Sequence, residues 1–490
     1  MADYDMAVIG GGLNGVSIAR DAAGRGLRVV LVEQDDIGGG ATAASPGLIH
    51  GNFSDLERGA FLRVRAALAE RDTLLRAAPH LLRLTRYVLP VHEQERPPSM
   101  LRASLFAYDR LAPRGFHAKT RELDLTHHEM GVPLKRSVDV AFDYSDGLID
   151  DTRLASLTAA DAAERGATIL TGARCVRADR TETWRVAIVN RGQREIIQAK
   201  ALVNATGAWV RGFSESVLRL PPPEVTFERV SAIVVRRLFD HENVYVFQNN
   251  DKQLVYAIPY EGDFTLIGLS AQPSTGDPAS VSATSADVTY LCQAASRYFR
   301  EAIGPSDVVR AVAAMNVLPA GDRNKRLRRD GLMKFDRKAG EVPLLTVYGG
   351  ASTTARRRAE LAMMRLAAFF APSSPWTSHS PLPGGDFSWR EREERIAAVQ
   401  DRWPFLSESN ARRLFTAYGT RIDNILGDAN SMEDLGPRFG AELTGAEVRY
   451  LMKSEFARFA DDILWRRSKL GLALSKPERD ELALFMATPA

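Results

Sequence analysis

A glycine-rich turn between a short apolar strand and a helix opens the chain and constrains its fold more than any other feature. In the run Ala7-Val8-Ile9-Gly10-Gly11-Gly12-Leu13-Asn14-Gly15, the first glycine of the motif allows a tight turn, the second lets a pyrophosphate approach the backbone, and the third lets the helix pack on the strand. A second apolar strand, Leu27 to Val32, ends on Glu33, which is placed to accept hydrogen bonds from a ribose. These features predict a dinucleotide site but leave NAD and FAD equally open.

Length and composition set the broad class of the protein. A chain of 490 residues is long enough for two or three domains, and its net charge of +3 does not indicate a nucleic-acid partner. The two cysteines, Cys175 and Cys292, are far apart in the sequence and offer no metal site or redox pair. The chain starts without a cleavable signal and lacks an apolar run of the ~18 residues needed to span a bilayer. We therefore expect a cytoplasmic protein without a metal.

Two segments after the glycine turn have helical patterns. Residues 57 to 79 place Phe61, Val64, Leu68, Leu74 and Leu75 on one apolar face. Residues 87 to 115 are basic, aromatic and interrupted by prolines. This second segment could rest on the inner face of a membrane through its apolar side, with Arg102, Arg110 and Arg114 near lipid phosphates, or it could be an internal amphipathic helix.

The rest of the chain alternates between strands and helices. We expect a crossover helix over 150–166, a buried strand that ends in Ala205-Thr206-Gly207, and a separate mixed or antiparallel sheet over 224–270. The strand Leu344 to Tyr348 turns at Gly349-Gly350 into a helix with a threonine cap. A proline-rich linker over 372–383 then leads to helical patterns from Trp389 to Phe485, among them 455–472.

Taken together in this order, the motifs resemble the FAD-dependent (aerobic) glycerol-3-phosphate dehydrogenases of the D-amino-acid-oxidase-like flavoprotein superfamily. The resemblance runs nearly end to end and rests on Val8 to Gly15, 21–27, Leu48-Ile49-His50-Gly51, Asp146 to Arg153, Val203 to Gly207, Gly349-Gly350, Thr353-Thr354, 382–385 and 461–467. It implies an α/β fold in three parts. These are a Rossmann-like FAD-binding domain (1–80, 145–220 and 340–371), an inserted mixed or antiparallel-sheet substrate domain (81–144 and 221–339), and an all-helical C-terminal domain (386–490).

The resemblance also implies a set of cofactor-binding residues. The ADP half of FAD would lie at the glycine turn and Glu33, the phosphates near Thr42 and Ser45, and the flavin near the second glycine turn. The full predicted set is Gly10, Gly12, Leu13, Asn14, Gly15, Glu33, Thr42, Ser45, Val176, Ala205, Thr206, Gly207, Gly350, Ser352, Thr353 and Thr354.

The substrate positions depart from the family pattern. Ser54 and Asn316 stand where the family has arginines, Gly47 and Ala351 where it has lysines, and Ala232 where it has the histidine proposed as the base. A phosphate monoester is held mainly by such cations. Because the cofactor motifs are intact, we expect an enzyme that kept FAD and changed its substrate. The candidate catalytic residues are His50, Ser54, Arg229 and Asn316.

Three functions remain open at this point. The first is oxidation of an alcohol or amine carbon in a non-standard, biosynthetic substrate, free or tethered to a carrier protein that docks on the basic run Arg323 to Arg329. The second is a genuine glycerol-3-phosphate dehydrogenase that uses Arg229, Arg356 and that basic run for phosphate. The third is a catalytically silent FAD-binding scaffold. A small-molecule substrate, a homodimer and peripheral membrane contact through 87–115 are further expectations, and the electron acceptor is left open.

Overall fold

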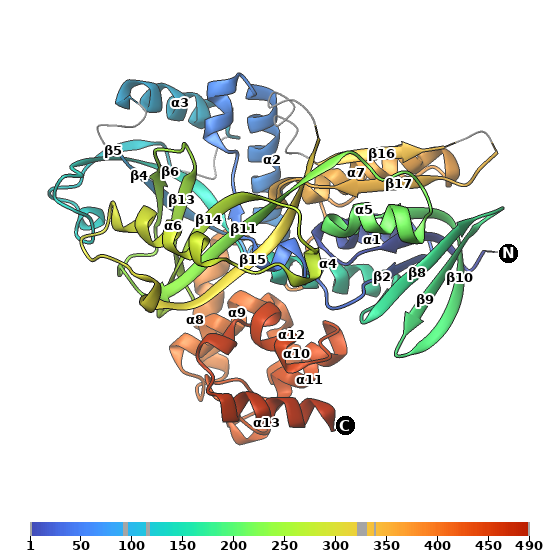
Figure 1. Cartoon of the computed structure of the whole chain (residues 1–490). Coiled ribbons are helices and arrows are strands. Elements are labelled where there is room, and N and C mark those ends of the chain that lie inside the picture. The colour runs from blue at the N-terminus through green and yellow to red at the C-terminus, as the bar shows by residue number, and fades with distance from the viewer. Residues whose placement is uncertain (1, 92–96, 114–117, 321–330, 338–339, 489–490) are drawn as a thin grey trace.

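The apolar strand that precedes the glycine turn lies in the middle of an eight-stranded sheet (Figure 1). The structure is a computed structural model that describes residues 2–91, 97–113, 118–320, 331–337 and 340–488. The strand order is β16 (Leu332–Asp336), β17 (Leu344–Tyr348), β10 (Gln193–Asn204), β1 (Tyr4–Ile9), β2 (Val29–Val32), β7 (Thr168–Leu170), with β8 (Ala173–Arg180) and β9 (Trp184–Asn190) joined to β10. The pairs from β17 to β7 are parallel, as a Rossmann-like unit requires.

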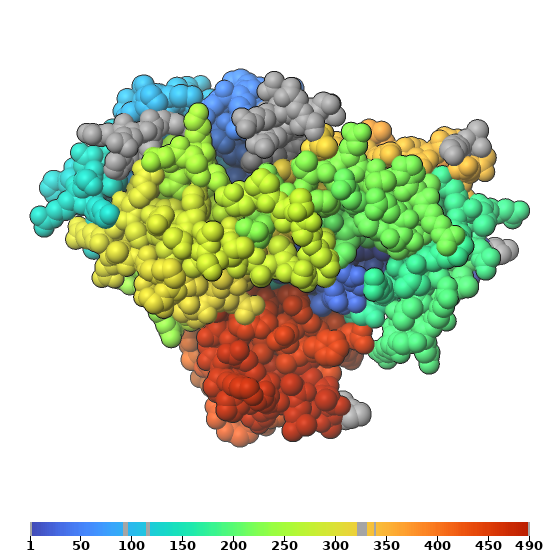
Figure 2. All heavy atoms as spheres, in the orientation of Figure 1, coloured from blue at the N-terminus to red at the C-terminus, as the bar shows by residue number. Residues whose placement is uncertain are grey.

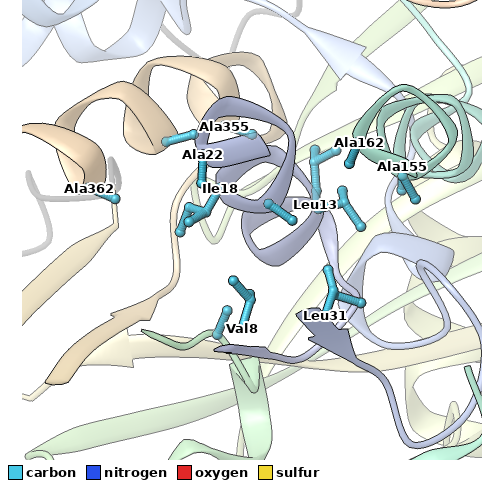
Figure 3. Close-up of a cluster of buried hydrophobic side chains, with 14 of the residues drawn as sticks. Val8, Leu13, Ile18, Ala22, Leu31, Ala155, Ala162, Ala355 and Ala362 are labelled. Atoms are coloured by element: carbon cyan, nitrogen blue, oxygen red, sulfur yellow. The ribbon is translucent and has the colours of Figure 1, made fainter. Parts of the chain in front are cut away.

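Three alanine-rich helices pack together above β1 and β2. They are α1 (Leu13–Gly24), α4 (Asp151–Glu164) and α7 (Ala355–Leu366). Small side chains at their contacts let the backbones approach closely, and Val8 and Leu31 fill the space below (Figure 3). The alanines labelled there are Ala22, Ala155, Ala162, Ala355 and Ala362. This packing places the N-terminal ends of α1 and α7 near each other, since Asn14 contacts Gly349.

A second, nine-stranded sheet forms the other half of the body. Its order is β15 (Val308–Pro319), β11 (Val225–Arg236), β14 (Phe264–Ser274), β13 (Leu254–Tyr260), β12 (Val244–Gln248), β4 (Arg83–Pro90), β6 (Val140–Leu148) and β3 (Leu48–Ile49), with β5 (Arg121–Asp124) beside β6. All pairs are antiparallel except β12 with β4. The predicted α/β fold with an inserted mixed sheet is confirmed. The sheets differ from the predicted boundaries at three strands, because β3 and the end of β6 (145–148) join the second sheet and β16 joins the first.

The two faces of the second sheet have different coverings. Ile233 and Val235 of β11 pack against α6 (Ser285–Ser296), whereas Ala232 and Val234 share a core with Leu105 of α3 (Pro98–Leu111). Successive residues of a strand point to opposite faces. Over residues 228–235 of β11, odd-numbered positions therefore face α6, and even-numbered positions face the side where Phe53 also packs.

The 87–115 segment is amphipathic where it is described, with one buried side and one exposed side. Residues 87–90 end strand β4 and are buried, and α3 turns Leu101, Leu105 and Tyr108 into the core while Phe106 stays exposed. Arg114 lies outside the described residues. Peripheral membrane contact through the exposed side of α3 stays a prediction. Within the residues described, no helix combines the length and the apolar character needed to cross a bilayer.

The helix expected over 57–79 begins later than predicted. It is α2 (Phe61–Ala77), and its buried side includes Val64, Leu68, Leu74 and Leu75. The inward placement of Phe61 was wrong, because its side chain is 49% exposed at the first turn of the helix.

The C-terminal part is helical, as predicted, and packs directly on the two-sheet body (Figure 2). It contains α8 (Arg392–Arg402), α9 (Glu408–Tyr418), α10 (Asp423–Leu426), α11 (Gly445–Ser454), α12 (Ala460–Asp462) and α13 (Lys476–Ala487). The helical pattern predicted over 455–472 is present only in part. The chain there forms α12, a π-helical turn Ile463–Arg467 and a 3₁₀ turn Leu470–Leu472. The proline-rich run before this domain packs on α1, since Trp376 donates to the Asp21 carbonyl and stacks on Arg20 and Arg165.

A pair of alanine variants on α3 tests which side of this helix faces the core. Leu105 is fully buried, whereas Phe106 is 58% exposed. We expect Leu105→Ala to destabilise the protein by about 2–5 kcal/mol, and Phe106→Ala to change stability by less than about 0.5 kcal/mol. Thermal and urea unfolding of the two variants would measure the difference. Equal losses would contradict the described orientation of α3.

Candidate functional site

The glycine turn is packed tightly at two positions and open at the third. Gly10 has a positive φ of +109°, and a Cβ atom there would lie 2.5 Å from the Ala205 carbonyl oxygen. A Cβ on Gly15 would lie 1.9 Å from the Gly10 carbonyl oxygen. At Gly12 the nearest atom would be Thr42 Oγ1, 3.9 Å away. The free space therefore lies at the glycine expected to admit a pyrophosphate.

The helix that starts at this turn has no side chain from its N-cap bonded to its first turn. Gly12 is the N-cap of α1 and offers no side-chain hydrogen bond to the helix amides. The Leu13 amide donates to Thr42 Oγ1 at 3.4 Å, at the edge of the open space. Because the amides at a helix N-terminus and the helix dipole both favour an anion, the turn fits a phosphate group.

Glu33, the predicted ribose acceptor, is bonded to the glycine turn. Its carboxylate accepts hydrogen bonds from the Gly11 amide at 2.6 Å and the Asp35 amide at 2.8 Å. Burial raises the pKa of Glu33 to about 7, although these two backbone donors oppose the shift. The residue as a whole is half-buried.

The other predicted residues of the adenosine and phosphate end surround this turn. Val176 falls where the β8–β9 register shifts, which leaves its backbone outside the ladder. Gly207 has a φ of +57° and open space beside its Cα. Ser45 donates a hydrogen bond to Asp151, the first residue of α4, and burial raises the pKa of Asp151 to about 6. The roles of Val176, Gly207 and Ser45 in cofactor binding stay predictions.

The second glycine turn is tied to the first by an arginine that sequence reasoning missed. Arg358, buried in α7, donates from Nε to Asn14 Oδ1 (2.8 Å), from Nη1 to Thr354 Oγ1 (2.7 Å) and from Nη2 to the Ala351 carbonyl (2.8 Å). Asn14 in turn donates to the Gly349 carbonyl at 3.1 Å. In the sequence, the one hint of this role is that Arg358 lies one helical turn after Thr354.

Thr354 does not cap α7 with its hydroxyl, contrary to the prediction. Thr354 is the N-cap, but its hydroxyl contacts the Ala351 carbonyl and Arg358 instead of a helix amide. The 3₁₀ turn Ser352–Thr354 leads directly into α7, and its N-cap, Ala351, offers no side-chain hydrogen bond, so this turn begins without a side-chain cap next to Gly350. This is where the resemblance placed the flavin end of FAD.

His50 is held against this turn from the other sheet. Its amide donates to Thr353 Oγ1 at 3.2 Å. The next amide, Gly51, donates to the buried Tyr108 hydroxyl at 2.7 Å, and Tyr108 donates to Asp146 at 2.7 Å. This network fixes the backbone on both sides of the His50 side chain, and its tyrosine comes from the segment first considered for membrane contact.

The candidate catalytic residues lie on two different faces of the second sheet. Asn316 pairs with Glu228 across β15 and β11, on the even-numbered face that also holds Ala232. Phe53 packs in the core on that face, which brings the segment from His50 to Ser54 to the same side. Sequence reasoning missed Glu228, because only strand register shows that it neighbours Asn316.

Arg229 faces the opposite side of the sheet. Its Nε donates to Asp287 Oδ2 of α6 at 2.7 Å. Arg356, the other cation considered for phosphate, donates to Glu70 at 2.9 Å and 2.6 Å and to Thr377 at 2.9 Å. Both would have to leave carboxylate partners to reach a substrate. The basic run Arg323 to Arg329 lies outside the described residues.

Two alanine variants separate the structural glycine from the binding glycine. Gly12→Ala places its methyl group in open space, so we expect a folded protein whose FAD affinity is strongly reduced. Gly15→Ala places its methyl group 1.9 Å from a backbone oxygen and should prevent native packing of α1. Circular dichroism melting of the apoproteins and FAD titration would measure these outcomes. Normal FAD affinity in Gly12→Ala would contradict the assigned position of the pyrophosphate.

The raised pKa of Glu33 predicts a pH-dependent affinity for FAD. Above about pH 7 the carboxylate is ionised and accepts ribose hydroxyls, whereas below it the protonated acid is a poorer acceptor. FAD affinity should fall as the pH drops below 7, by at most about tenfold per pH unit for one proton. Titrations from pH 6 to pH 8.5 would measure this. Glu33→Gln should abolish the dependence, and the exposed neighbour variant Asp35→Asn should retain it; a profile that survives Glu33→Gln would contradict the assignment.

Comparison with known proteins supports the expected family. A family model described as "FAD dependent oxidoreductase" matches residues 5–354, and one described as "C-terminal domain of alpha-glycerophosphate oxidase" matches residues 375–484. The chain is 40% identical to a glycerol-3-phosphate dehydrogenase of Pseudomonas aeruginosa, over 99% of this chain and 95% of that protein. It is 39% identical to a D-erythritol 1-phosphate dehydrogenase of Brucella abortus, over 97% of this chain and 96% of that protein.

A solved structure agrees with this relationship. The glycerol-3-phosphate dehydrogenase of Bacillus halodurans, complexed with FAD, matches 99% of this chain and 94% of its own with a TM-score of 0.76 at 20% identity. The open spaces at Gly12 and Gly207 and the two uncapped helices fit FAD as the cofactor. The chain belongs to the FAD-dependent oxidoreductases of the glycerol-3-phosphate dehydrogenase type.

Proposed function

We propose that this flavoenzyme oxidises an alcohol or amine carbon of a substrate that is not held through a phosphate monoester. The observation that carries the proposal is the pairing of Asn316 with Glu228 on the face shared with Ala232. The family pattern has an arginine at position 316 and a histidine at position 232. Here the same face presents a neutral amide next to a carboxylate.

The charges at this face oppose phosphate binding. Hydrogen bonds to a charged group contribute about 1.5–3 kcal/mol each, and Ser54, Asn316 and Ala351 replace three cations of the family pattern. Loss of three such contacts weakens binding by several orders of magnitude. Glu228 adds a like charge, which repels a phosphate and attracts a cationic or hydrogen-bond-donating group.

The remaining groups suit the proton chemistry of either substrate class. FAD, when bound, supplies the acceptor for a hydride. His50, whose backbone is fixed by Thr353 and Tyr108, is the candidate acceptor for the hydroxyl proton of an alcohol. A neutral amine needs no base at this step, since its nitrogen lone pair stabilises the carbon that loses hydride. The lack of a histidine at position 232 therefore disfavours oxidation of an alcohol more than oxidation of an amine.

A genuine glycerol-3-phosphate dehydrogenase is the second candidate. The names of two relatives from Pseudomonas, 39–40% identical, favour it, whereas the relative from Brucella abortus is named for another phosphorylated polyol. In that case the phosphate ligands would differ from the family pattern, and Arg229 and Arg356 would exchange their carboxylate partners for the substrate.

Anaerobic reduction of the bound flavin distinguishes the candidates. The holoenzyme would be mixed with glycerol 3-phosphate, glycerol, longer polyols, amines and amino acids, and loss of the visible flavin absorbance would be followed. We expect reduction by a non-phosphorylated alcohol or amine and little by millimolar glycerol 3-phosphate. Rapid reduction by glycerol 3-phosphate would overturn the proposal, and a flavin that no compound reduces would favour the scaffold interpretation.

Restoring cations tests the charge argument directly. Ser54→Arg with Asn316→Arg should increase the rate of flavin reduction by glycerol 3-phosphate at least tenfold, and adding Glu228→Gln should increase it further because the carboxylate no longer neutralises the new arginine. Asn430→Arg, on an exposed position of the helical domain, adds the same charge away from the sheet and should have no effect. An equal response to all variants would contradict the proposed role of this face.

A further inference from the structure

We infer that the C-terminal helical domain completes the FAD site by holding the loop that carries Glu33. Arg466 and Arg467, at the end of the π-helical turn, are the positioning residues, and Asp36 is their target. This inference concerns the cofactor and does not depend on the identity of the substrate.

The contact between Arg467 and Asp36 is buried and two-pronged. Arg467 Nη1 and Nη2 donate to the two carboxylate oxygens of Asp36, each at 2.7 Å. The same guanidinium donates from Nη2 to the Glu455 carbonyl at 2.7 Å, and its side chain has no exposed surface. Paired planar hydrogen bonds of this kind fix orientation as well as distance.

Arg466 approaches the same carboxylate from a second direction. It donates to Asp36 and to Asp462 of its own domain. Burial alone would raise the pKa of Asp36, but the two guanidinium groups lower it, so the carboxylate stays charged. A buried carboxylate stays charged only while such partners neutralise it. Removing one of the two guanidinium groups leaves part of the negative charge of Asp36 without a counter-charge.

Asp36 is connected to the cofactor turn by three contacts within six residues. Glu33 accepts from the Gly11 amide at 2.6 Å, and the Gly38 amide donates to the Gly11 carbonyl at 3.0 Å. Ile37 lies against the Gly11 Cα, where a Cβ atom would meet its Cδ1 at 2.9 Å. Displacement of Asp36 would therefore move both the ribose acceptor and the glycine turn.

The adjoining segment of the helical domain also contacts α4, the helix that begins at Asp151. Thr152 Oγ1 donates to the Arg466 carbonyl at 2.7 Å, and Lys469 Nζ lies 2.9 Å from Asp150. In the space-filling view, red atoms of the C-terminal domain border blue atoms of the N-terminal part of the chain (Figure 2). The domain thus reaches the cofactor loop and the helix beside it through one short stretch of chain.

Binding of ADP to the apoprotein isolates this effect from the flavin. We expect Arg467→Gln and Asp36→Asn to weaken binding of both ADP and FAD by roughly tenfold to a hundredfold, with Arg467→Lys intermediate because it keeps the charge but loses the fork. The reduction potential of the bound flavin should stay unchanged. Arg421→Gln is the matched control, because Arg421 joins the helical domain to Glu164 of α4 without touching the loop.

Hydrogen exchange provides a second measurement, which would not change if Arg466 and Arg467 only stabilised the fold. If the domain and the cofactor loop are coupled, ADP should slow amide exchange over 455–469 in the wild-type protein and in Arg421→Gln, but not in Asp36→Asn. Should Arg467→Gln fail to fold, Asp36→Asn and Arg466→Gln provide the same readings. Wild-type affinity for ADP and FAD in the folded variants would overturn the inference.

Discussion

The closest backbone approach at the cofactor turn, between Gly10 and Gly15, is the contact on which the rest of the structure depends. It brings the first turn of α1 directly onto the end of β1, with Ala205, the residue after β10, on the other side. From that position Asn14 reaches the turn that precedes α7. The close fit between Gly10 and Gly15 therefore helps to place the N-terminal ends of α1 and α7 near each other. An extended ligand with two anionic groups needs two such helix ends.

The proposed substrate face differs from the cofactor turn, because charge matters there more than steric fit. One face of the second sheet carries Asn316 beside Glu228. Asn316 and Glu228 are cross-strand neighbours, so the effect of each on a ligand includes the effect of the other. The fold can thus keep its cofactor chemistry while the compound presented to it changes.

Sequence patterns predicted the parts of this structure that arise from local rules. The glycine turn, Glu33 and the strands around them follow from spacing, and the three-part α/β organisation follows from the order of motifs. Glu228, Arg358 and Tyr108 could not be predicted, because their roles depend on strand register or on partners far away in the sequence. The breaks in the helical pattern over 455–472 could not be predicted for a related reason, since Arg466 and Arg467 bind Asp36 from a π-helical turn instead of a regular α-helix.

The contact between Asp36 and Arg467 joins residues that are 431 positions apart. At a synthesis rate of about 5–20 residues per second, the ribosome needs roughly 20 to 90 s to make the chain between them. During that interval the nascent protein already contains the glycine turn and Glu33 but not the arginine that holds their loop. Firm retention of FAD is therefore a late event in biosynthesis, and a chain truncated before residue 467 would be released with an incompletely held cofactor.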